Sequence, residues 1–217
     1  MTTLPSSYNP VRSDEFVGPA RLAAEHIDRL TALALPSKAP LRLILTGKPG
    51  IGKTKLANYF VVRLGGNKWN THKFNGAQVK VEEVEDLTRS LCFKDLFGGY
   101  QVVQIEEIDK MPAVARGRML TFCDDMPVGT ALVATTNLSA DEMRASNPAT
   151  QRRYTWIELD PPSASDIQTL LETHWPEIGA QGIRSIAEMA CGCVGWALQE
   201  ADAWLAQAPR TATLLAA

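Results

Sequence analysis

The sequence predicts an α/β fold in which a mostly parallel sheet is sandwiched between helices, followed by a small all-helical subdomain. Two observations support this prediction. Short apolar runs typical of buried strands alternate with segments whose apolar residues recur at helical spacing. After the break at Asp160–Pro162 only helical patterns remain. We therefore expect an α/β domain over 1–160 and a helical subdomain over 161–217.

The first predicted elements follow directly from this spacing. A helix is expected over 19–35, where a proline stands at the start and further prolines follow the end. Residues 41–46, Leu-Arg-Leu-Ile-Leu-Thr, are typical of a buried parallel strand. Helical spacing resumes over 53–64 and stops at a glycine pair. This order places a glycine-rich loop between a strand and a helix.

The alternation continues to the break. Helices are expected over 81–92 and 111–126, and strands over 100–109, 130–137 and 154–159. The strand at 100–109 ends in acidic residues. In the C-terminal part, the predicted helices cover 163–175, 182–191 and 194–207.

Composition narrows the class of protein. Hydrophobic residues make up 45% and charged residues 21% of the 217 residues, as in soluble globular proteins. The formal net charge is −2, so no global basic field indicates a nucleic-acid binder. Any contact with DNA would have to come from a local patch or from several assembled copies.

The cysteines and the N-terminus indicate a cytoplasmic protein. Cys92, Cys123, Cys191 and Cys193 do not have zinc-knuckle spacing, so they are expected to be structural thiols. No secretory signal and no apolar run of membrane-spanning length occurs. We expect a reduced, soluble chain with no membrane contact.

The loop after the first strand carries the strongest motif. It satisfies the pattern G-x-x-x-x-G-K-[ST], in which glycines let backbone N–H groups turn toward phosphate oxygens. The lysine would reach the β and γ phosphates, and the threonine hydroxyl would hold Mg²⁺. The predicted phosphate-binding residues are Gly47, Lys48, Pro49, Gly50, Ile51, Gly52, Lys53 and Thr54.

The acids at the end of the 100–109 strand should face the same crevice, because ligands bind at the carboxyl ends of parallel strands. Phosphoryl transfer to water needs one carboxylate near Mg²⁺ and one that polarises the attacking water. We assign Glu106 to the metal and Glu107 to the water. Asp109 is expected to cap the helix that follows Met111, against the alternative that it contacts the nucleotide.

These motifs resemble those of AAA+ ATPases, P-loop proteins whose helical subdomain is called the lid, and most of all those of clamp-loader (replication factor C type) small subunits. GKPGIGKT is similar to Walker A, VVQIEEID to Walker B and ALVATTN to the sensor 1 strand. The resemblance implies that Asn137 orients the lytic water. The segment YNPVRSDEFVG is similar to an adenine-contacting box, which implies nucleotide contacts from Pro10, Val17 and, beside the loop, Lys55.

The segment NPATQRRYTWIEL resembles the family's arginine-finger segment. The resemblance implies that Arg153, with Arg152 as its substitute, reaches the nucleotide of a neighbouring subunit. It also implies ATP and Mg²⁺ as cofactors, a homo- or hetero-oligomer of AAA+ subunits, and DNA and a sliding clamp as partners in replication. Lys110, Arg116 and Arg118 are candidates for DNA contacts, against the alternative of a solvated basic helix face.

Three departures keep other functions open. Glu106 stands where Walker B usually carries aspartate, Gly195 stands where the lid motif usually carries arginine, and no helical collar is seen after the lid. The main hypothesis is an ATP-hydrolysing clamp-loader-like protein. The alternatives are another AAA+ remodeller, such as a helicase loader or protein-remodelling ATPase, and an ATP-binding structural subunit with little hydrolysis.

Overall fold

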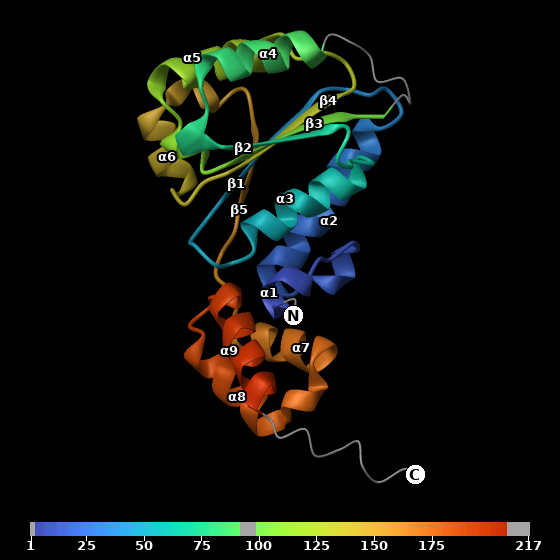
Figure 1. The fold of residues 1–217 in the computed structure, drawn as a ribbon, viewed down its shortest axis with the longest axis vertical. Helices are drawn as coiled ribbons and strands as arrows, with labels where there is room; N and C mark the ends of the chain where they lie inside the picture. The colour runs from blue at the N-terminus through green and yellow to red at the C-terminus, as the bar shows by residue number, and fades with distance from the viewer. Residues whose placement is uncertain (1–2, 92–98, 208–217) are drawn as a thin grey trace.

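A computed structural model describes residues 3–91 and 99–207. Its strands form one parallel sheet in the order β2-β3-β4-β1-β5 (Figure 1). The strands are β1 (Leu41–Thr46), β2 (Thr71–Asn75), β3 (Gln101–Glu106), β4 (Thr130–Thr135) and β5 (Thr155–Glu158). Because β4 lies between β1 and β3, the segment that follows β4 lies between the phosphate loop after β1 and the acids after β3.

Helices cover both faces of the sheet (Figure 1). One face carries α2 (Gly18–Ala34) and α3 (Lys53–Arg63), and the other carries α4 (Val81–Leu91), α5 (Ala113–Asp124) and α6 (Ala140–Ser146). The predicted fold class, a helix-covered parallel sheet followed by helices, is therefore confirmed.

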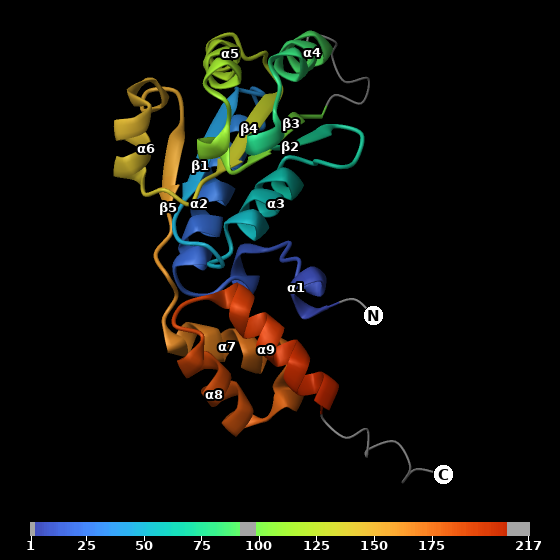
Figure 2. The same ribbon diagram turned by 60° about the vertical axis from the view of Figure 1, so that its left-hand side comes forward.

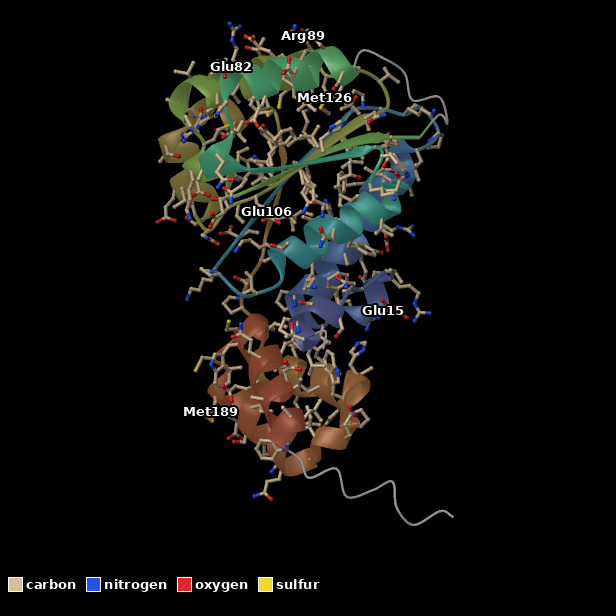
Figure 3. All side chains as sticks on the ribbon, in the orientation of Figure 1. Glu15, Glu82, Arg89, Glu106, Met126 and Met189 are labelled. Carbon is tan, nitrogen blue, oxygen red and sulfur yellow. The ribbon has the colours of Figure 1, made fainter. Side chains whose placement is uncertain are left out.

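Alternation along the strands explains the two layers. Leu43 and Leu45 of β1 belong to the apolar cluster under α2 and α3, whereas Ile44 belongs to the cluster under α4 and α5. Each central strand is thus buried on both faces, as its continuous apolar sequence predicts. The polar face of α4 points away from this core, as Glu82 and Arg89 do in Figure 3.

The C-terminal helices form a separate group (Figure 2). They are α7 (Ala164–His174), α8 (Ala180–Met189) and α9 (Val194–Gln207), and their apolar cluster also includes Tyr8 of the N-terminal segment. The short helix α1 (Leu4–Ser7) packs on α9. The N-terminal segment therefore contacts the helical group as well as the α/β layers, and the division at residue 160 stays a prediction.

The structure contains three helices or strands that the sequence did not predict: the short N-terminal helix α1, the edge strand β2 and the helix α6. The third strand also ends earlier than expected, at Glu106, because Glu107 adopts a left-handed conformation. Short 3₁₀ segments complete the described chain: η1 (Ser13–Glu15), η2 (Gly76–Gln78), η3 (Ile108–Lys110), η4 (Pro148–Thr150) and η5 (Pro176–Ile178).

The described cysteines are free thiols. Cys123 is buried, Cys191 is exposed and Cys193 is intermediate, whereas Cys92 lies outside the described residues. In residues 3–91 and 99–207 no helix combines the length and the apolar character needed to cross a membrane.

Candidate functional site

The phosphate loop after β1 depends on its glycines for shape. Gly47, Gly50 and Gly52 have φ angles of 137°, 78° and 107°, a region that side chains disfavour. A Cβ on Gly47 would lie 2.5 Å from the carbonyl oxygen of Leu159, and nothing lies within 4 Å of a Cβ on Gly52. The loop is therefore bare on the side of Gly52, where α3 begins with unpaired N–H groups.

Lys53 is held inside this loop. The residue is only 8% exposed, and its Nζ donates hydrogen bonds to the carbonyl oxygens of Gly47 (2.6 Å) and Lys48 (2.7 Å). Burial lowers the pKa of Lys53, and the nearby carboxylates of Asp109 and Glu107 oppose that shift. The ammonium group is thus already positioned where a phosphate would replace the carbonyl contacts.

Glu106 and Glu107 lie at the end of β3, as predicted (Figure 3 labels Glu106). Glu107 has a φ of 54°, which is uncommon for a residue other than glycine. Its N–H donates to Thr135 Oγ1 at 3.4 Å, and its carboxylate accepts from Lys110 Nζ at 2.9 Å. A Cβ on Gly76 would lie 2.2 Å from the Glu107 carbonyl oxygen, so this close approach requires glycine. Strained conformations of this kind often occur at functional sites.

Asp109 does not cap the following helix, so that prediction was wrong. Its Oδ1 accepts a hydrogen bond from the Thr136 hydroxyl at 2.6 Å, and the N-cap of α5 is Pro112. Asp109 therefore accepts from the Thr136 hydroxyl, after β4, and α5 has no side-chain cap. Asp109 thus connects the segment after β3 to the segment that carries Asn137.

A single cavity of about 400 Å³ joins these elements, a size that suits a small-molecule ligand. Phosphate-loop residues, both glutamates and Asn137 line one side, and the N-terminal segment and the lid helices line the other. Of the site residues predicted from the sequence, those that line this cavity are Pro49, Gly50, Ile51, Gly52, Lys53, Thr54, Lys55, Glu106, Glu107, Asn137 and Val17. Gly47 and Lys48 contact Lys53 but do not line the cavity, and Pro10 lines a neighbouring hollow.

The cavity wall also contains residues that the sequence did not single out. Tyr8 and Phe16 come from the N-terminal segment, and Leu170 and Leu198 come from α7 and α9. The Tyr8 hydroxyl donates to the Glu15 carbonyl oxygen at 2.8 Å, and burial raises the pKa of Tyr8. The segment 8–18 indicated this wall, but no local pattern indicates which apolar residues of a distant helix complete it.

The donor set fits a magnesium ion that arrives with phosphates. Thr54 and Glu106 both line the cavity, and a hydroxyl and a carboxylate are hard oxygen donors of the kind that suits Mg²⁺. Within the described ranges no three His, Cys, Asp or Glu residues form a metal site of their own. Mg²⁺ ions bound to proteins often complete their coordination shell with substrate phosphates and water.

The two predicted finger arginines lie away from this cavity and differ in their contacts. Arg153 Nε and Nη2 donate to the two carboxylate oxygens of Asp124 at 2.7 Å, and Nη1 donates to the Ala149 carbonyl oxygen at 2.7 Å. The Arg153 hydrogen bond lowers the pKa of Asp124. Arg152 is exposed. Arg152 is therefore the more solvent-accessible of the two arginines.

The candidate DNA-contacting residues have partners within the chain. Lys110 pairs with Glu107 at 2.9 Å, and Arg118 pairs with Glu85 at 3.4 Å. Arg116 Nη2 donates to the carbonyl oxygens of Asp109 and Met111. Arg116 thus stabilises the start of α5, which favours a structural role for this arginine.

A parallel sheet with a phosphate loop after β1 and a lid beside it defines a P-loop nucleoside triphosphatase fold. The sequence pattern of the AAA family, described as the ATPase family associated with various cellular activities, matches residues 43–158, more than half of the chain. The chain belongs to this family, and the prediction of an ATPase is confirmed at that level.

The similar proteins include RuvB proteins. RuvB of Chlorobium phaeobacteroides, a Holliday junction branch migration complex subunit, is 28% identical over 136 residues, which cover 62% of this chain and 37% of that protein. A variant of Thermotoga maritima RuvB superposes with a TM-score of 0.70 at 18% identity, covering 88% of this chain and 63% of that chain. A structure described as the Thermotoga maritima RuvB Holliday junction branch migration motor gives a TM-score of 0.63 at 21% identity, with the same two coverages.

Sequence identity and coverage determine what these similarities show about the chain. At such identities, the solved structures support the fold alone. The chain spans less than two thirds of the length of each of these relatives. None of them is a clamp loader, so the clamp-loader and replication predictions gain no support from them.

Proposed function

We propose that this chain is a Mg²⁺-dependent AAA ATPase that acts as an oligomer and remodels DNA, as a motor and not as a clamp loader. The observation that carries the proposal is the single cavity that brings Lys53, Thr54, Glu106, Glu107 and Asn137 together beside a lid. The proposal follows the remodeller alternative because the matched relatives are RuvB proteins.

The phosphate end of the cavity has the groups that ATP hydrolysis requires. The loop N–H groups and the Lys53 ammonium would bind the β and γ phosphates. Thr54 and Glu106 would hold Mg²⁺, which neutralises phosphate charge when bound. Glu107 would polarise the attacking water, and Asn137 would orient it. Glu107 must leave Lys110 to act in this way.

The opposite end of the cavity is apolar and suits a nucleobase. Tyr8, Phe16 and Val17 line it from the N-terminal segment, and Leu170 and Leu198 line it from the lid. Apolar walls with few polar groups are typical of small-molecule sites. ATP bound here would contact three parts of the chain that are distant in sequence.

A DNA substrate and an oligomer are suggested by the family and by the relatives' names. Arg152 is exposed and lies outside its own subunit's cavity, as an arginine acting in a neighbouring site would. With a net charge of −2, a single copy has little general attraction for DNA, so assembly would be needed to form a binding track.

The test measures ATP turnover per subunit against protein concentration, with a four-way DNA junction, with linear duplex and without DNA. We expect turnover per subunit to rise with concentration and to rise further with the junction. Glu107→Gln should bind ATP but lose turnover by roughly 100-fold or more, because it lacks the carboxylate that acts on water. Stimulation by primer-template DNA and a sliding clamp, but not by the junction, would contradict the proposal.

A second candidate is an ATP-binding structural subunit. Gly195 in place of a lid arginine, and the engagement of Glu107 by Lys110, favour it. It predicts tight ATP binding with turnover equal to that of Glu107→Gln at every protein concentration.

A further inference from the structure

The first turn of α9 contacts the tip of the phosphate loop through the main chain. The N–H of Gly195 donates a hydrogen bond to the carbonyl oxygen of Gly50 at 2.8 Å. Gly195 is the second residue of α9, and first-turn N–H groups have no acceptor within their own helix. The Gly50 carbonyl oxygen of the phosphate loop therefore supplies the acceptor that this N–H of α9 lacks, and both residues line the cavity.

Close packing supports this hydrogen bond. A Cβ on Gly50 would lie 2.3 Å from Cys193 Sγ, so the loop tip must be glycine for the lid to lie this near. A Cβ on Gly195 would lie 3.5 Å from Gly50 Cα, which is an ordinary contact. Cys193 Sγ itself accepts the N–H of Trp196 at 3.4 Å, which fixes the thiol beside the loop.

The contact joins two groups with separate apolar cores. Helices α7, α8 and α9 share one cluster, whereas the phosphate-loop residue Ile51 belongs to the cluster under α2 and α3. Gly50 and Gly195 both line the cavity, together with Val194 and Leu198 of α9. Separation of Gly195 from Gly50 would therefore widen the cavity by moving its lid-side wall.

We propose that the Gly195 N–H and the Gly50 carbonyl oxygen form a main-chain latch that holds the lid on the phosphate loop and slows nucleotide exchange. A neutral hydrogen bond thus occupies the position where the family resemblance predicts an arginine. This inference rests on the proposed binding of a nucleoside triphosphate in the cavity. It makes Gly195 a positioning residue, because its effect on the nucleotide acts through the lid.

Two substitutions at Gly195 distinguish the effect of losing the hydrogen bond from the effect of changing a residue in α9. Gly195→Pro removes the N–H, and proline is tolerated in the first turn of a helix. Gly195→Ala keeps the N–H and adds a methyl group at an ordinary contact distance. Each variant is loaded with a fluorescent ATP analogue and Mg²⁺, and its dissociation is followed by stopped flow after excess ATP is added.

We expect Gly195→Pro to release the analogue about 3- to 10-fold faster than wild type, the loss associated with one neutral hydrogen bond. Gly195→Ala should remain within about twofold, since it retains the donor. Equal dissociation rates for the two variants would overturn the latch. Melting temperatures and association rates should be similar in both, which a general loss of structure would not allow.

A second measurement needs no substitution and no nucleotide. Hydrogen exchange of the Gly195 amide, followed by NMR in the wild-type chain, should be slow because the N–H is bonded to Gly50. Exchange at the rate of a free amide would refute the latch. A wild-type chain that binds no ATP analogue while its Gly195 amide is protected would instead refute the proposed function and leave the contact itself established.

Discussion

Glu107 illustrates how the surroundings of one residue determine its backbone conformation. Its neighbour Glu106 ends β3 in regular geometry, whereas Glu107 turns into the left-handed region. That turn depends on the missing side chain of Gly76 and on the hydroxyl of Thr135. The sequence predicted both carboxylates from their place after an apolar strand, but the left-handed turn depends on residues far along the chain.

Cys123 provides a prediction about pH. Burial raises the pKa of its thiol from 9.0 to about 11, and the Tyr154 hydroxyl lies 3.1 Å from Sγ. The neutral thiol therefore stabilises the fold fully below pH 9, and this contribution is lost as the pH rises from about 9 toward 11. By pH 10 the loss should be about 1.4 kcal/mol.

The measurement is urea unfolding at pH 8 and pH 10. Wild type should lose more unfolding free energy over this interval than Cys123→Ala, because the variant has no thiol to ionise. Cys191→Ser is the matched control, since Cys191 is exposed, and its loss should equal that of wild type. If wild type and Cys123→Ala lose the same unfolding free energy between pH 8 and pH 10, the raised pKa of the Cys123 thiol is contradicted.

At the scale of elements, long periodic segments were predicted well. The ranges expected for α2, α3 and β1 agree with the structure to within one or two residues, because apolar spacing, prolines and glycines mark them clearly. The strand β2 was missed because Thr71–Asn75 is an edge strand with few apolar residues. The helix α6 is short, and its capping box at Ser139 and Glu142 is its only strong local signal.

Replacing two glycines by alanine is expected to change the stability of the protein in opposite directions. Gly76 precedes α4 and contacts the Glu107 backbone, so Gly76→Ala should displace the segment between β3 and η3. We expect lower stability and a lower turnover number with little change in ATP affinity. Gly117 lies within α5, and nothing lies within 4 Å of a Cβ there. Gly117→Ala should therefore stabilise the protein by about 0.5–1 kcal/mol and leave turnover unchanged.

Thermal unfolding and steady-state ATPase assays on the two variants test this pair. A Gly76→Ala protein with wild-type turnover would show that the Glu107 conformation does not depend on the contact with Gly76. Both changes replace glycine by alanine, so they alter the backbone entropy of the unfolded chain in a similar way. A difference in stability or turnover between the two variants therefore reports the surroundings of each glycine in the folded chain.

At the scale of the molecule, the sequence indicated the strand-end residues that line the cavity better than the apolar residues that complete its wall. Lys53, Glu107 and Asn137 were indicated by motifs at the ends of strands, and parallel topology brings such ends together. The apolar part of the cavity wall depends on how α7 and α9 pack against the N-terminal segment. No short pattern encodes that packing, because its contacts join residues more than 100 positions apart.

The arginines raise the last question at this scale, which is whether one subunit completes the site of another. Arg153 is held by Asp124, whereas Arg152 is exposed and remote from the cavity of its own chain. We therefore expect Arg152→Ala to lower turnover by roughly 1,000-fold while ATP affinity is retained, since an arginine acting in trans stabilises charge during transfer and contributes little to initial binding.

Mixing two inactive variants makes the test specific to interfaces. Glu107→Gln lacks the carboxylate that we propose acts on water but keeps Arg152. Arg152→Ala has an intact cavity but lacks the arginine that we propose acts in trans. In a mixed oligomer, some interfaces should combine the intact cavity of one variant with the arginine of the other, so turnover should exceed that of either variant alone. Lys53→Ala in place of Glu107→Gln should rescue equally if assembly does not require ATP. Arg153→Ala is the matched arginine control and should retain turnover. If mixtures never exceed the sum of their parts at concentrations where the chain is assembled, Arg152 does not act across a subunit interface.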